Sequence, residues 1–381
     1  MLEDFLNAKP LFYDEIDYTR MPRVYNSIKK YLKLPKIIHL VGTNGKGTTG
    51  RFLASALFSL GFKTGHYTSP HILHFNERVW LDGKSVTNTL LNAKHEELLT
   101  YLTKEDTDAL SYFEYTTLLA MLIYRDVDYL VLEAGLGGEF DATAVFTNIL
   151  TLVTPIDIDH EAFLGDTIKA IATTKLNATQ TQAILAKQKH VDVYRVAEKL
   201  EKKKKISFIS IEKYIEAGDR IKIEKIAIRN SLASYLQDNL TLAISALNYL
   251  EIPYTIESFD NSRLFGRLSQ ISENILLDVG HNVLAARSIV ASLNDFKYTL
   301  VYNSYKDKNY KEILTILKPI INDVEIIAID DERGESIEIM QETLNVLGIK
   351  NQQFVKISKE KNYLVFGSFS VAEAFLKGRS E

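Results

Sequence analysis

Residues 42–48 read GTNGKGT, and they lie between an apolar run at 37–41 and a segment of helical spacing at 49–60. This order predicts a strand, a glycine loop and a helix. In such an arrangement backbone N–H groups and the helix N-terminus converge on a phosphate, while Lys46 supplies a positive charge and Thr48 a hydroxyl for Mg²⁺. An ordinary strand-to-helix turn is the alternative. Three glycines with a lysine and a threonine at the helix entrance favour a nucleotide phosphate site.

The spacing of this loop departs from the usual P-loop. Gly42 and Gly45 enclose two residues rather than four, and Gly47 stands between Lys46 and Thr48. A search for the usual pattern, GxxxxGK[ST], would therefore miss the loop.

Composition indicates a globular protein with more than one domain. The chain has 381 residues, 46% hydrophobic and 25% charged, with a net charge of −4, which argues against a surface dominated by nucleic-acid binding. It has no cysteine, so disulfides, thiolate zinc sites and a cysteine nucleophile are excluded. The acidic N-terminus does not resemble a signal peptide, and no apolar run is long enough to span a membrane. We expect a cytoplasmic protein that binds neither membrane nor nucleic acid.

Strand and helix patterns alternate along the chain. Apolar runs at 37–41, 128–133 and 148–154 predict buried parallel strands, residues 77–81 alternate like a half-buried strand, and 88–103 and 113–125 have helical spacing. This alternation predicts an α/β fold with a doubly wound, mostly parallel sheet that contains the P-loop, in a first domain at 1–261. Ligands of such sheets bind at the carboxyl ends of the strands.

The pattern begins again in a second, smaller domain at 262–381. Strands are predicted at 275–279, 298–302, 324–329, 354–357 and 363–366, and helices at 283–293, 310–317, 337–347 and 371–376. This alternation predicts a Rossmann-like C-terminal domain.

Several polar residues follow predicted strands. Glu133 comes directly after an apolar strand, so it is either a surface strand end or a carboxylate that holds the Mg²⁺ of a nucleotide. His160 follows the next strand, although an isolated histidine is more often structural. Lys175 lies on a predicted helix, where a surface lysine is the alternative. In the second domain Asp278 and His281 follow the first strand.

Arg267 lies just upstream and has the chemistry to meet a phosphate, although exposed arginines next to linkers are common. The residues alone therefore support a magnesium-dependent nucleotide-binding enzyme whose acceptor is unspecified.

Several sequence blocks together resemble one family, the dihydrofolate synthase and folylpolyglutamate synthase enzymes of the Mur ligase superfamily. These blocks are GTNGKGT at 42–48, YTSPH at 67–71, ERV at 77–79, YFEYTT at 112–117, LEAGLGGEFDAT at 132–143, IDIDH at 156–160, LFGRLS at 264–269, LLDVGHN at 276–282 and VFGSF at 365–369. Gly47 favours the folate enzymes, because cell-wall Mur ligases typically have the hydroxyl residue directly after the lysine.

The resemblance implies an ATP-dependent amide ligase with a Mur ligase-like ATP-binding domain and a C-terminal glutamate ligase domain. ATP would phosphorylate the carboxylate of dihydropteroate, or of the terminal glutamate of a reduced folate, and L-glutamate would attack the acyl phosphate. We expect a bifunctional monomer that uses two Mg²⁺ ions. The alternatives are a Mur-type ligase acting on a cell-wall precursor and a non-catalytic nucleotide-binding relative.

The resemblance also implies a role for particular residues. ATP would be bound by Gly42, Thr43, Asn44, Gly45, Lys46, Gly47, Thr48, Asn239, Arg267, Asp278 and His281; the metals by Thr48, Ser69, Glu133 and His160; and the pterin or aminobenzoyl ring by Tyr112 and Phe113. Lys46, His160 and Lys175 would be catalytic, and Lys175 matches a lysine that is carbamylated in the superfamily.

The chain departs from the family pattern in four places. The residues around Lys175 read TKLN where the family usually has EKAG, Glu139 stands in place of an arginine and Ala144 in place of an asparagine. The DKD segment of the family is here DKN at 307–309.

Overall fold

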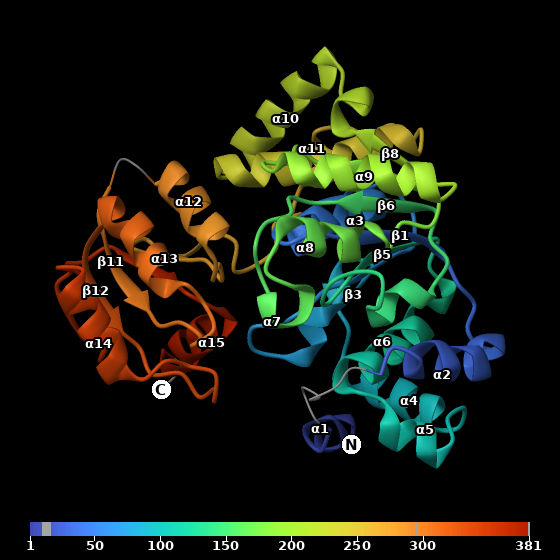
Figure 1. Cartoon of the computed structure of the whole chain (residues 1–381), viewed down its shortest axis with the longest axis horizontal. Helices are drawn as coiled ribbons and strands as arrows, with labels where there is room; N and C mark the ends of the chain where they lie inside the picture. Colours follow the sequence, from blue (N-terminus) through green and yellow to red (C-terminus); the bar gives the residue numbers. More distant parts are fainter. Residues whose placement is uncertain (10–16, 294–295, 380–381) are drawn as a thin grey trace. The chain divides into compact units, whose positions relative to one another are not determined.

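The computed structural model describes residues 1–9, 17–293 and 296–379, and the chain divides into two compact units. The first unit consists of Met1–Asn230 and Asp238–Ser262, and the second of Ser231–Gln237 and Arg263–Glu381. Each unit has its own sheet (Figure 1).

The first unit is built on an eight-stranded sheet with the order β4-β3-β2-β5-β1-β6-β7-β8. The six strands from β2 to β8 in this order are parallel. The strand β3 pairs antiparallel with β2, and β4 pairs antiparallel with β3. Their bounds are β1 Lys36–Val41, β2 Thr64–Tyr67, β3 Val79–Leu81, β4 Lys84–Ser85, β5 Tyr129–Glu133, β6 Leu150–Val153, β7 Gln182–Leu185 and β8 Ser207–Ser210. The central strands β1, β5 and β6 are mostly apolar and are buried along almost their whole length, because helices cover both faces of the sheet.

Helices of the first unit cover the sheet on both sides. One face packs against α1, α2, α4 and α6 beside β2, β5 and β1, and against α8 and α9 beside β6 and β7; Figure 1 shows α2, α4, α5 and α6 grouped together. The helix α3 contacts β2 and β5. The bounds are α1 Leu2–Asn7, α2 Arg20–Ile28, α3 Lys46–Ser59, α4 Asn88–Leu99, α5 Lys104–Ala109, α6 Tyr112–Ile123, α7 Glu161–Leu164, α8 Ile168–Leu176, α9 Val191–Lys203 and α10 Ala217–Arg229. The helix α11 Ser234–Tyr249 belongs to the first unit from Asp238 onward.

The second unit has a six-stranded sheet with the order β13-β12-β11-β14-β10-β9, in which β9 alone is antiparallel. The bounds are β9 Ser269–Ser272, β10 Ile275–Leu277, β11 Tyr298–Tyr302, β12 Ile321–Ile326, β13 Asn351–Gln353 and β14 Tyr363–Phe366, with helices α12 Val283–Ser292, α13 Tyr310–Leu317, α14 Ile337–Val346 and α15 Phe369–Gly378. The prediction of a mostly parallel α/β fold with a second, smaller Rossmann-like sheet is confirmed.

Several predicted strands were wrong in extent or absent. The strand predicted at 324–329 is β12 Ile321–Ile326, and the one predicted at 275–279 ends at Leu277. Residues 77–81 are a strand only from Val79, because the Glu77 carboxylate accepts the backbone N–H groups of Ile72, Leu73 and His74, each at 2.8 Å, and so holds a tight turn before the strand. Residues 354–357 form no strand; the edge strand is instead the polar β13.

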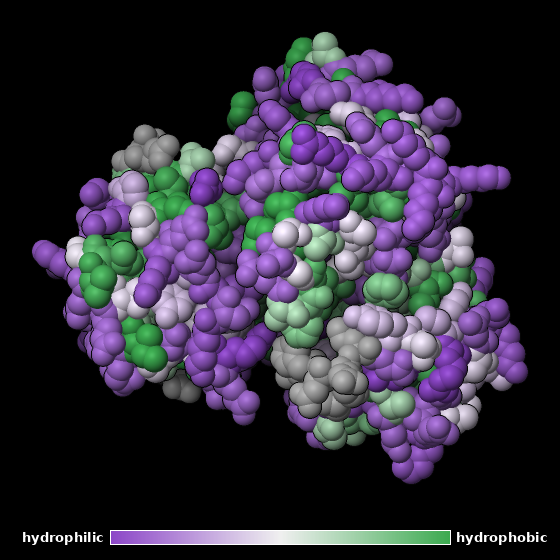
Figure 2. Space-filling view, viewed as in Figure 1, coloured by the Kyte–Doolittle hydropathy of each residue, from purple (hydrophilic) through white to green (hydrophobic). Residues whose placement is uncertain are grey.

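Hydrophilic side chains cover most of the surface shown in Figure 2, and apolar side chains appear there in small groups. Within the described ranges, no helix has both the length and the apolar character needed to cross a membrane.

Candidate functional site

The glycine loop joins β1 to α3 as predicted. Gly45 has a φ of 90° and is the N-cap of α3, so the N–H groups of the first helical turn point toward the loop. Gly42 has a φ of 144°, and a Cβ there would lie 1.9 Å from Thr154 Oγ1. Only glycine fits at both positions, and the result is a tight loop at the carboxyl edge of the sheet whose geometry suits a phosphate.

Asn239 lies directly against this loop. A Cβ on Gly45 would come within 2.2 Å of Asn239 Oδ1, and this oxygen also accepts the Thr49 hydroxyl at 3.3 Å. The structure therefore brings Asn239 next to the P-loop, although almost 200 residues separate them in sequence.

Lys46 lies inside the loop, near Glu133. Its Nζ is 3.3 Å from the carbonyl oxygen of Gly42 and 3.9 Å from Glu133 Oε1. Glu133 is 4% exposed, and its Oε2 accepts the Thr68 hydroxyl and, at 3.2 Å, the Ser69 backbone N–H. Sequence reasoning selected Ser69 and missed Thr68, whose only signal was its place in the YTSPH block.

Lys175 approaches the same loop from α8. Its Nζ donates to the Gly42 carbonyl oxygen at 2.8 Å, and the residue is 4% exposed. Burial, followed by the charge of Lys46, lowers the pKa of Lys175 to about 7, and Asp159 and Asp141 oppose this shift. Burial therefore favours the neutral amine form of Lys175.

The glycine-rich segment after β5 packs on α8 beside Lys175. A Cβ on Gly138 would lie 2.8 Å from the Lys175 carbonyl oxygen, and the Glu139 N–H donates to Thr174 O at 2.9 Å. The Glu139 carboxylate accepts from Asn177 Nδ2 at 2.8 Å. The glutamate that replaces the family's arginine thus bonds to α8.

A buried network of hydrogen bonds, which was not predicted from the sequence, fixes this glycine-rich segment to β1. His39 Nε2 lies 2.8 Å from Thr143 Oγ1, and that hydroxyl donates to Asp141. Asp141 also accepts the Leu136 N–H at 2.9 Å. Burial lowers the pKa of His39 to about 4, which keeps the imidazole neutral, and burial raises the pKa of Asp141.

His160 is exposed and is the N-cap of α7, with a φ of 54°. Over the ranges that the structure describes, no three His, Cys, Asp or Glu side chains gather as a ready-made metal centre. The metal role of His160 stays a prediction.

Tyr112 and Phe113 begin α6, at the end of the sheet where β2 and β5 finish. The Phe113 ring lies 6.0 Å from that of Tyr67 and packs on Gly135, where a Cβ would lie 2.6 Å from Phe113 Cζ. The Arg78 guanidinium lies 5.3 Å from the centre of the Tyr112 ring. Both aromatic residues therefore lie beside segments that also contact Glu133.

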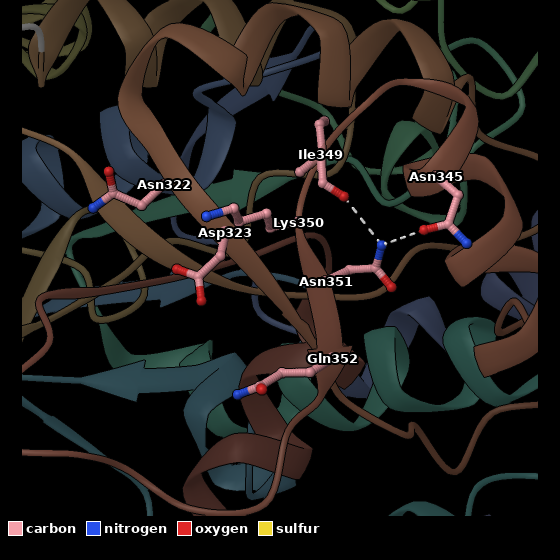
Figure 3. A pocket seen from close by; sticks show the side chains of 7 residues that line it. All are labelled: Asn322, Asp323, Asn345, Ile349, Lys350, Asn351 and Gln352. Atoms are coloured by element: carbon pink, nitrogen blue, oxygen red, sulfur yellow. Dashed lines mark hydrogen bonds between the residues drawn. The ribbon is translucent and has the colours of Figure 1, made fainter.

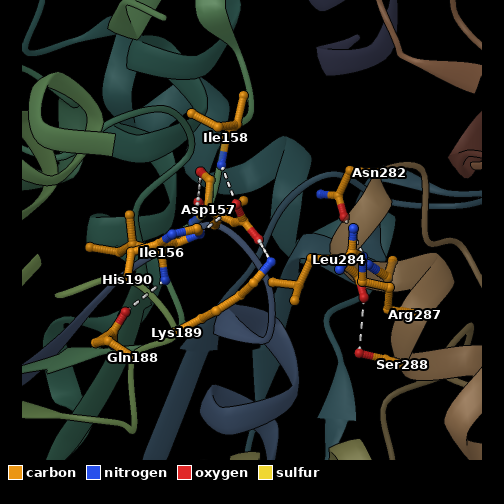
Figure 4. Close-up of polar contacts among 12 residues, drawn as sticks. Ile156, Asp157, Ile158, Gln188, Lys189, His190, Asn282, Leu284, Arg287 and Ser288 are labelled. Carbon is orange, nitrogen blue, oxygen red and sulfur yellow. Dashed lines mark hydrogen bonds and ion pairs between the residues drawn. The ribbon is translucent and has the colours of Figure 1, made fainter. Parts of the chain in front are cut away.

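A second set of polar contacts lies after β6 and β7, among Asp157, Lys189 and His190, which Figure 4 labels. The Thr43 hydroxyl donates to the Asp157 carbonyl oxygen at 3.0 Å. The Asp157 carboxylate lies 2.9 Å from His190 Nε2 and 3.8 Å from Lys189 Nζ. The structure thus places Thr43 against the IDIDH block.

In the second unit, Asp278 is buried and organises the turn after β10. Its Oδ2 accepts from the Tyr235 hydroxyl at 2.6 Å and from the Leu268 N–H at 2.8 Å, and Oδ1 accepts the Gly280 N–H at 2.8 Å. Burial and the neighbouring carboxylate hold the pKa of Tyr235 well above its usual value.

The other two residues predicted in this unit lie near the same turn. His281 Nδ1 is 3.2 Å from the Val279 carbonyl oxygen, and the Arg267 guanidinium lies 5.5 Å from the centre of the Phe369 ring. The Asn282 side chain, labelled in Figure 4, caps α12 by accepting the Ala285 N–H at 3.0 Å. The turn and the helix start are thereby fixed around Asp278.

A polar pocket of this unit lies at the opposite edge of its sheet, near the amino ends of β12 and β13 (Figure 3). Asn351 Nδ2 donates there to Ile349 O at 3.0 Å and to Asn345 Oδ1 at 2.9 Å. The lining residues are Asn322, Asp323, Asn345, Ile349, Lys350, Asn351 and Gln352. None of the predicted site residues belongs to this pocket.

Comparisons with known proteins agree on one family. No protein-family model matches the chain. A dihydrofolate synthase/folylpolyglutamate synthase from Buchnera aphidicola subsp. Baizongia pistaciae is 30% identical over 396 residues, covering 95% of this chain and 91% of the relative. The crystal structure of Helicobacter pylori folylpolyglutamate synthetase is 38% identical, with a TM-score of 0.81 over 100% of this chain and 98% of that one.

A third comparison shows the fold alone. The bifunctional folylpolyglutamate synthase/dihydrofolate synthase of Yersinia pestis, solved in complex with AMPPNP and Mn ion, has a TM-score of 0.82 at 22% identity and covers 100% of this chain and 97% of that one.

Proposed function

The chain belongs to the dihydrofolate synthase/folylpolyglutamate synthase family, and from that premise we propose that its P-loop site joins L-glutamate to dihydropteroate and to reduced folates. It is an ATP-dependent ligase. The observation that carries the proposal is the convergence of the P-loop, Lys46, Glu133 and Lys175 at one edge of the first sheet.

The proposed reaction has two steps. A carboxylate oxygen of the folate substrate attacks the γ-phosphorus of ATP, which forms an acyl phosphate and releases ADP. The amine of L-glutamate then attacks the acyl carbon, loses a proton and expels phosphate. In both steps negative charge develops on oxygen atoms of the reacting groups. The site therefore needs fixed cations and N–H donors rather than a protein nucleophile. Lys46 and the N-terminus of α3 supply them.

The residues beside the P-loop fit a magnesium ion. Mg²⁺ prefers oxygen ligands and is commonly held by one or two carboxylates with the substrate phosphates. Glu133 offers a buried carboxylate, and Thr48 and Ser69 offer hydroxyls. The ion, when bound, would neutralise charge on the phosphates. The Yersinia pestis enzyme with AMPPNP and Mn ion supports a nucleotide with a divalent metal; a second ion held by His160 is part of the proposal.

Carbamylation of Lys175 would turn a cation beside the P-loop into an anion. A neutral amine is required to attack CO₂, and the lowered pKa of Lys175 supports that chemistry. Its carboxylate-like product would orient a metal where the ammonium would repel one. Thr174 and Leu176 replace the neighbours usual in the family, but they do not remove the burial that lowers the pKa.

We propose binding roles for the remaining site residues. The loop Gly42, Thr43, Asn44, Gly45, Lys46, Gly47 and Thr48 would bind ATP together with Asn239, Arg267, Asp278 and His281, and Tyr112 and Phe113 would bind the pterin or aminobenzoyl ring. We also propose that the protein is a cytoplasmic monomer with an ATP-binding domain at 1–261 and a glutamate ligase domain at 262–381.

Phosphate release tests this function. Purified protein with ATP, Mg²⁺ and L-glutamate should release phosphate only when dihydropteroate or tetrahydrofolate is added. Release that needs no pterin, or no release with either substrate, would overturn the proposal. A UDP-linked cell-wall precursor serves as the comparison substrate, because its turnover would identify a Mur-type ligase instead.

A further inference from the structure

Arg78 is a half-buried cation that has no anionic partner among the described side chains. Among the residues that the structure describes it makes no ion pair, and its guanidinium donates a single hydrogen bond, from Nε to His71 Nδ1 at 2.8 Å. Arg20 and Arg23 of the same unit do form ion pairs, with Glu114 and Asp106, whereas Arg51 forms none within the described ranges and likewise donates Nε to a histidine. Most of the hydrogen-bond donors of Arg78 are therefore available to a ligand.

The guanidinium is nevertheless held in place. It lies 5.3 Å from the ring centre of Tyr112 and 6.0 Å from that of Phe75, so two aromatic faces confine it. The loop that carries His71 is fixed by Glu77, which accepts three of its backbone N–H groups. A fixed, unpaired guanidinium is suited to bind a carboxylate through two parallel hydrogen bonds.

The position of Arg78 indicates which carboxylate of the substrate it binds. Its backbone carbonyl accepts the Thr68 N–H at 2.9 Å, and the Thr68 hydroxyl contacts Glu133 in the proposed metal site. Its side chain lies over Tyr112 in the proposed ring site. Arg78 thus lies between the residues assigned to the pterin end and those assigned to the reacting end of the substrate.

We propose that Arg78, oriented by His71 and Tyr112, binds the non-reacting α-carboxylate of the glutamyl group of a folate substrate. This inference rests on the proposed function. In a folate the glutamyl group follows the ring system, and its γ-carboxylate reacts while its α-carboxylate does not. Dihydropteroate has a single carboxylate, which reacts. Arg78 therefore serves the addition of glutamate to folates and has no corresponding partner in dihydropteroate.

The test compares two substrates in steady-state kinetics. Arg78→Gln should lower kcat/KM for tetrahydrofolate about 10- to 100-fold, mainly through KM, because one charge-assisted contact is lost. The value for dihydropteroate should stay within about 3-fold of the parent. Arg78→Lys keeps the charge over the rings without the planar fork, so its loss should be intermediate.

A substrate analogue gives a second, independent readout. Replacing the α-carboxylate of the folate by a carboxamide should cost the parent enzyme the same factor as Arg78→Gln, and should cost Arg78→Gln little more. Arg51→Gln is the matched control, because Arg51 also donates Nε to a histidine, His66, at 3.2 Å and lies 5.0 Å from the ring of Trp80. It should leave the ratio of the two activities unchanged.

Three results would overturn the inference: an equal loss with both substrates, no loss with either, or a parent enzyme that uses dihydropteroate alone. Equal losses accompanied by a lower melting temperature would mean that Arg78 only supports its loop. A parent that turns over neither substrate would refute the proposed function itself, which keeps the two failures distinguishable.

Discussion

Lys46 is the residue on which the proposed chemistry depends most directly. Its Nζ lies within the loop, close to the Gly42 carbonyl and Glu133. Lys46→Ala should lower turnover about 100-fold or more, since a charge that stabilises the transferring phosphoryl group is lost. Phosphate release measures the effect. Lys36→Ala is the control, because Lys36 is exposed at the other end of β1. Full turnover by Lys46→Ala would refute its role.

If Lys175 is carbamylated, the activity of the enzyme should depend on both pH and CO₂. Its pKa of about 7 lies below that of a lysine in the unfolded chain, so the neutral fraction rises as the pH rises through 7. Carbamylation, and with it activity, should increase from pH 6 to pH 8, fall in degassed buffer and return with added bicarbonate. The ¹³C signal of a carbamate, or its mass on intact protein, reports the modification.

Lys169→Ala is the control for this experiment, since Lys169 lies exposed on the same helix. It should keep the pH profile of the parent. An active enzyme whose Lys175 carries no carbamate at any pH would overturn the assignment.

The sequence predicted the positions of residues in the fold best where the signal is local: the glycine loop joins β1 to α3 and Glu133 ends β5, while the roles of these residues stay predictions. The glycine loop, Lys46 and Glu133 could be found because strand, glycine and charge follow one another in the chain. The bond between His39 and Thr143 joins residues 104 positions apart, and a histidine on an apolar strand indicates only a core position. Arg78 was missed for a related reason: its lack of an ion-pair partner is a property of the folded structure.

At the scale of elements, the β1–loop–α3 unit requires glycine at the helix start. Gly45→Ala should weaken nucleotide binding about 5- to 150-fold, on the order of 1–3 kcal/mol, because a left-handed φ and a Cβ 2.2 Å from Asn239 Oδ1 both oppose alanine. Calorimetric titration with an ATP analogue measures the loss.

Gly61→Ala is a matched control at the other end of α3. Its φ of 92° is close to the 90° of Gly45, but no atom lies within 4 Å of a Cβ there. This variant should lower stability by about 1 kcal/mol and leave nucleotide affinity unchanged. Equal effects of the two variants on affinity would show that backbone strain, rather than the contact with Asn239, matters.

Buried elements were predicted better than edge elements. The strand at 298–302 and the helix at 310–317 have the predicted bounds, because apolar periodicity marks elements that face a core. The edge strand β13 is NQQ, whose side chains are half-buried or exposed, while Val355, in the apolar run that was predicted instead, is 83% exposed. An edge strand is defined by backbone pairing with one neighbour, which side-chain pattern does not reveal.

At the scale of the whole molecule, the chain combines two α/β units, each with polar residues at the carboxyl edge of its sheet. The second unit contains Ser231–Gln237 as well as the C-terminal part, so α11 begins in one unit and continues in the other. The sequence does not show this division of α11, because a helix whose residues belong to two units has the same apolar periodicity as a helix of one unit.

The central claim is that ATP activates the carboxylate of a folate substrate. Transfer of ¹⁸O from that carboxylate tests this claim most directly. The enzyme is given ATP, Mg²⁺, L-glutamate and a pterin substrate that carries ¹⁸O in both oxygens of the reacting carboxylate. The mass of the released phosphate is then measured by mass spectrometry. An acyl phosphate leaves one carboxylate oxygen on the phosphate, so we expect one ¹⁸O in each phosphate and one glutamyl residue added to each product. Unlabelled phosphate, or phosphate released without a glutamylated product, would contradict the account.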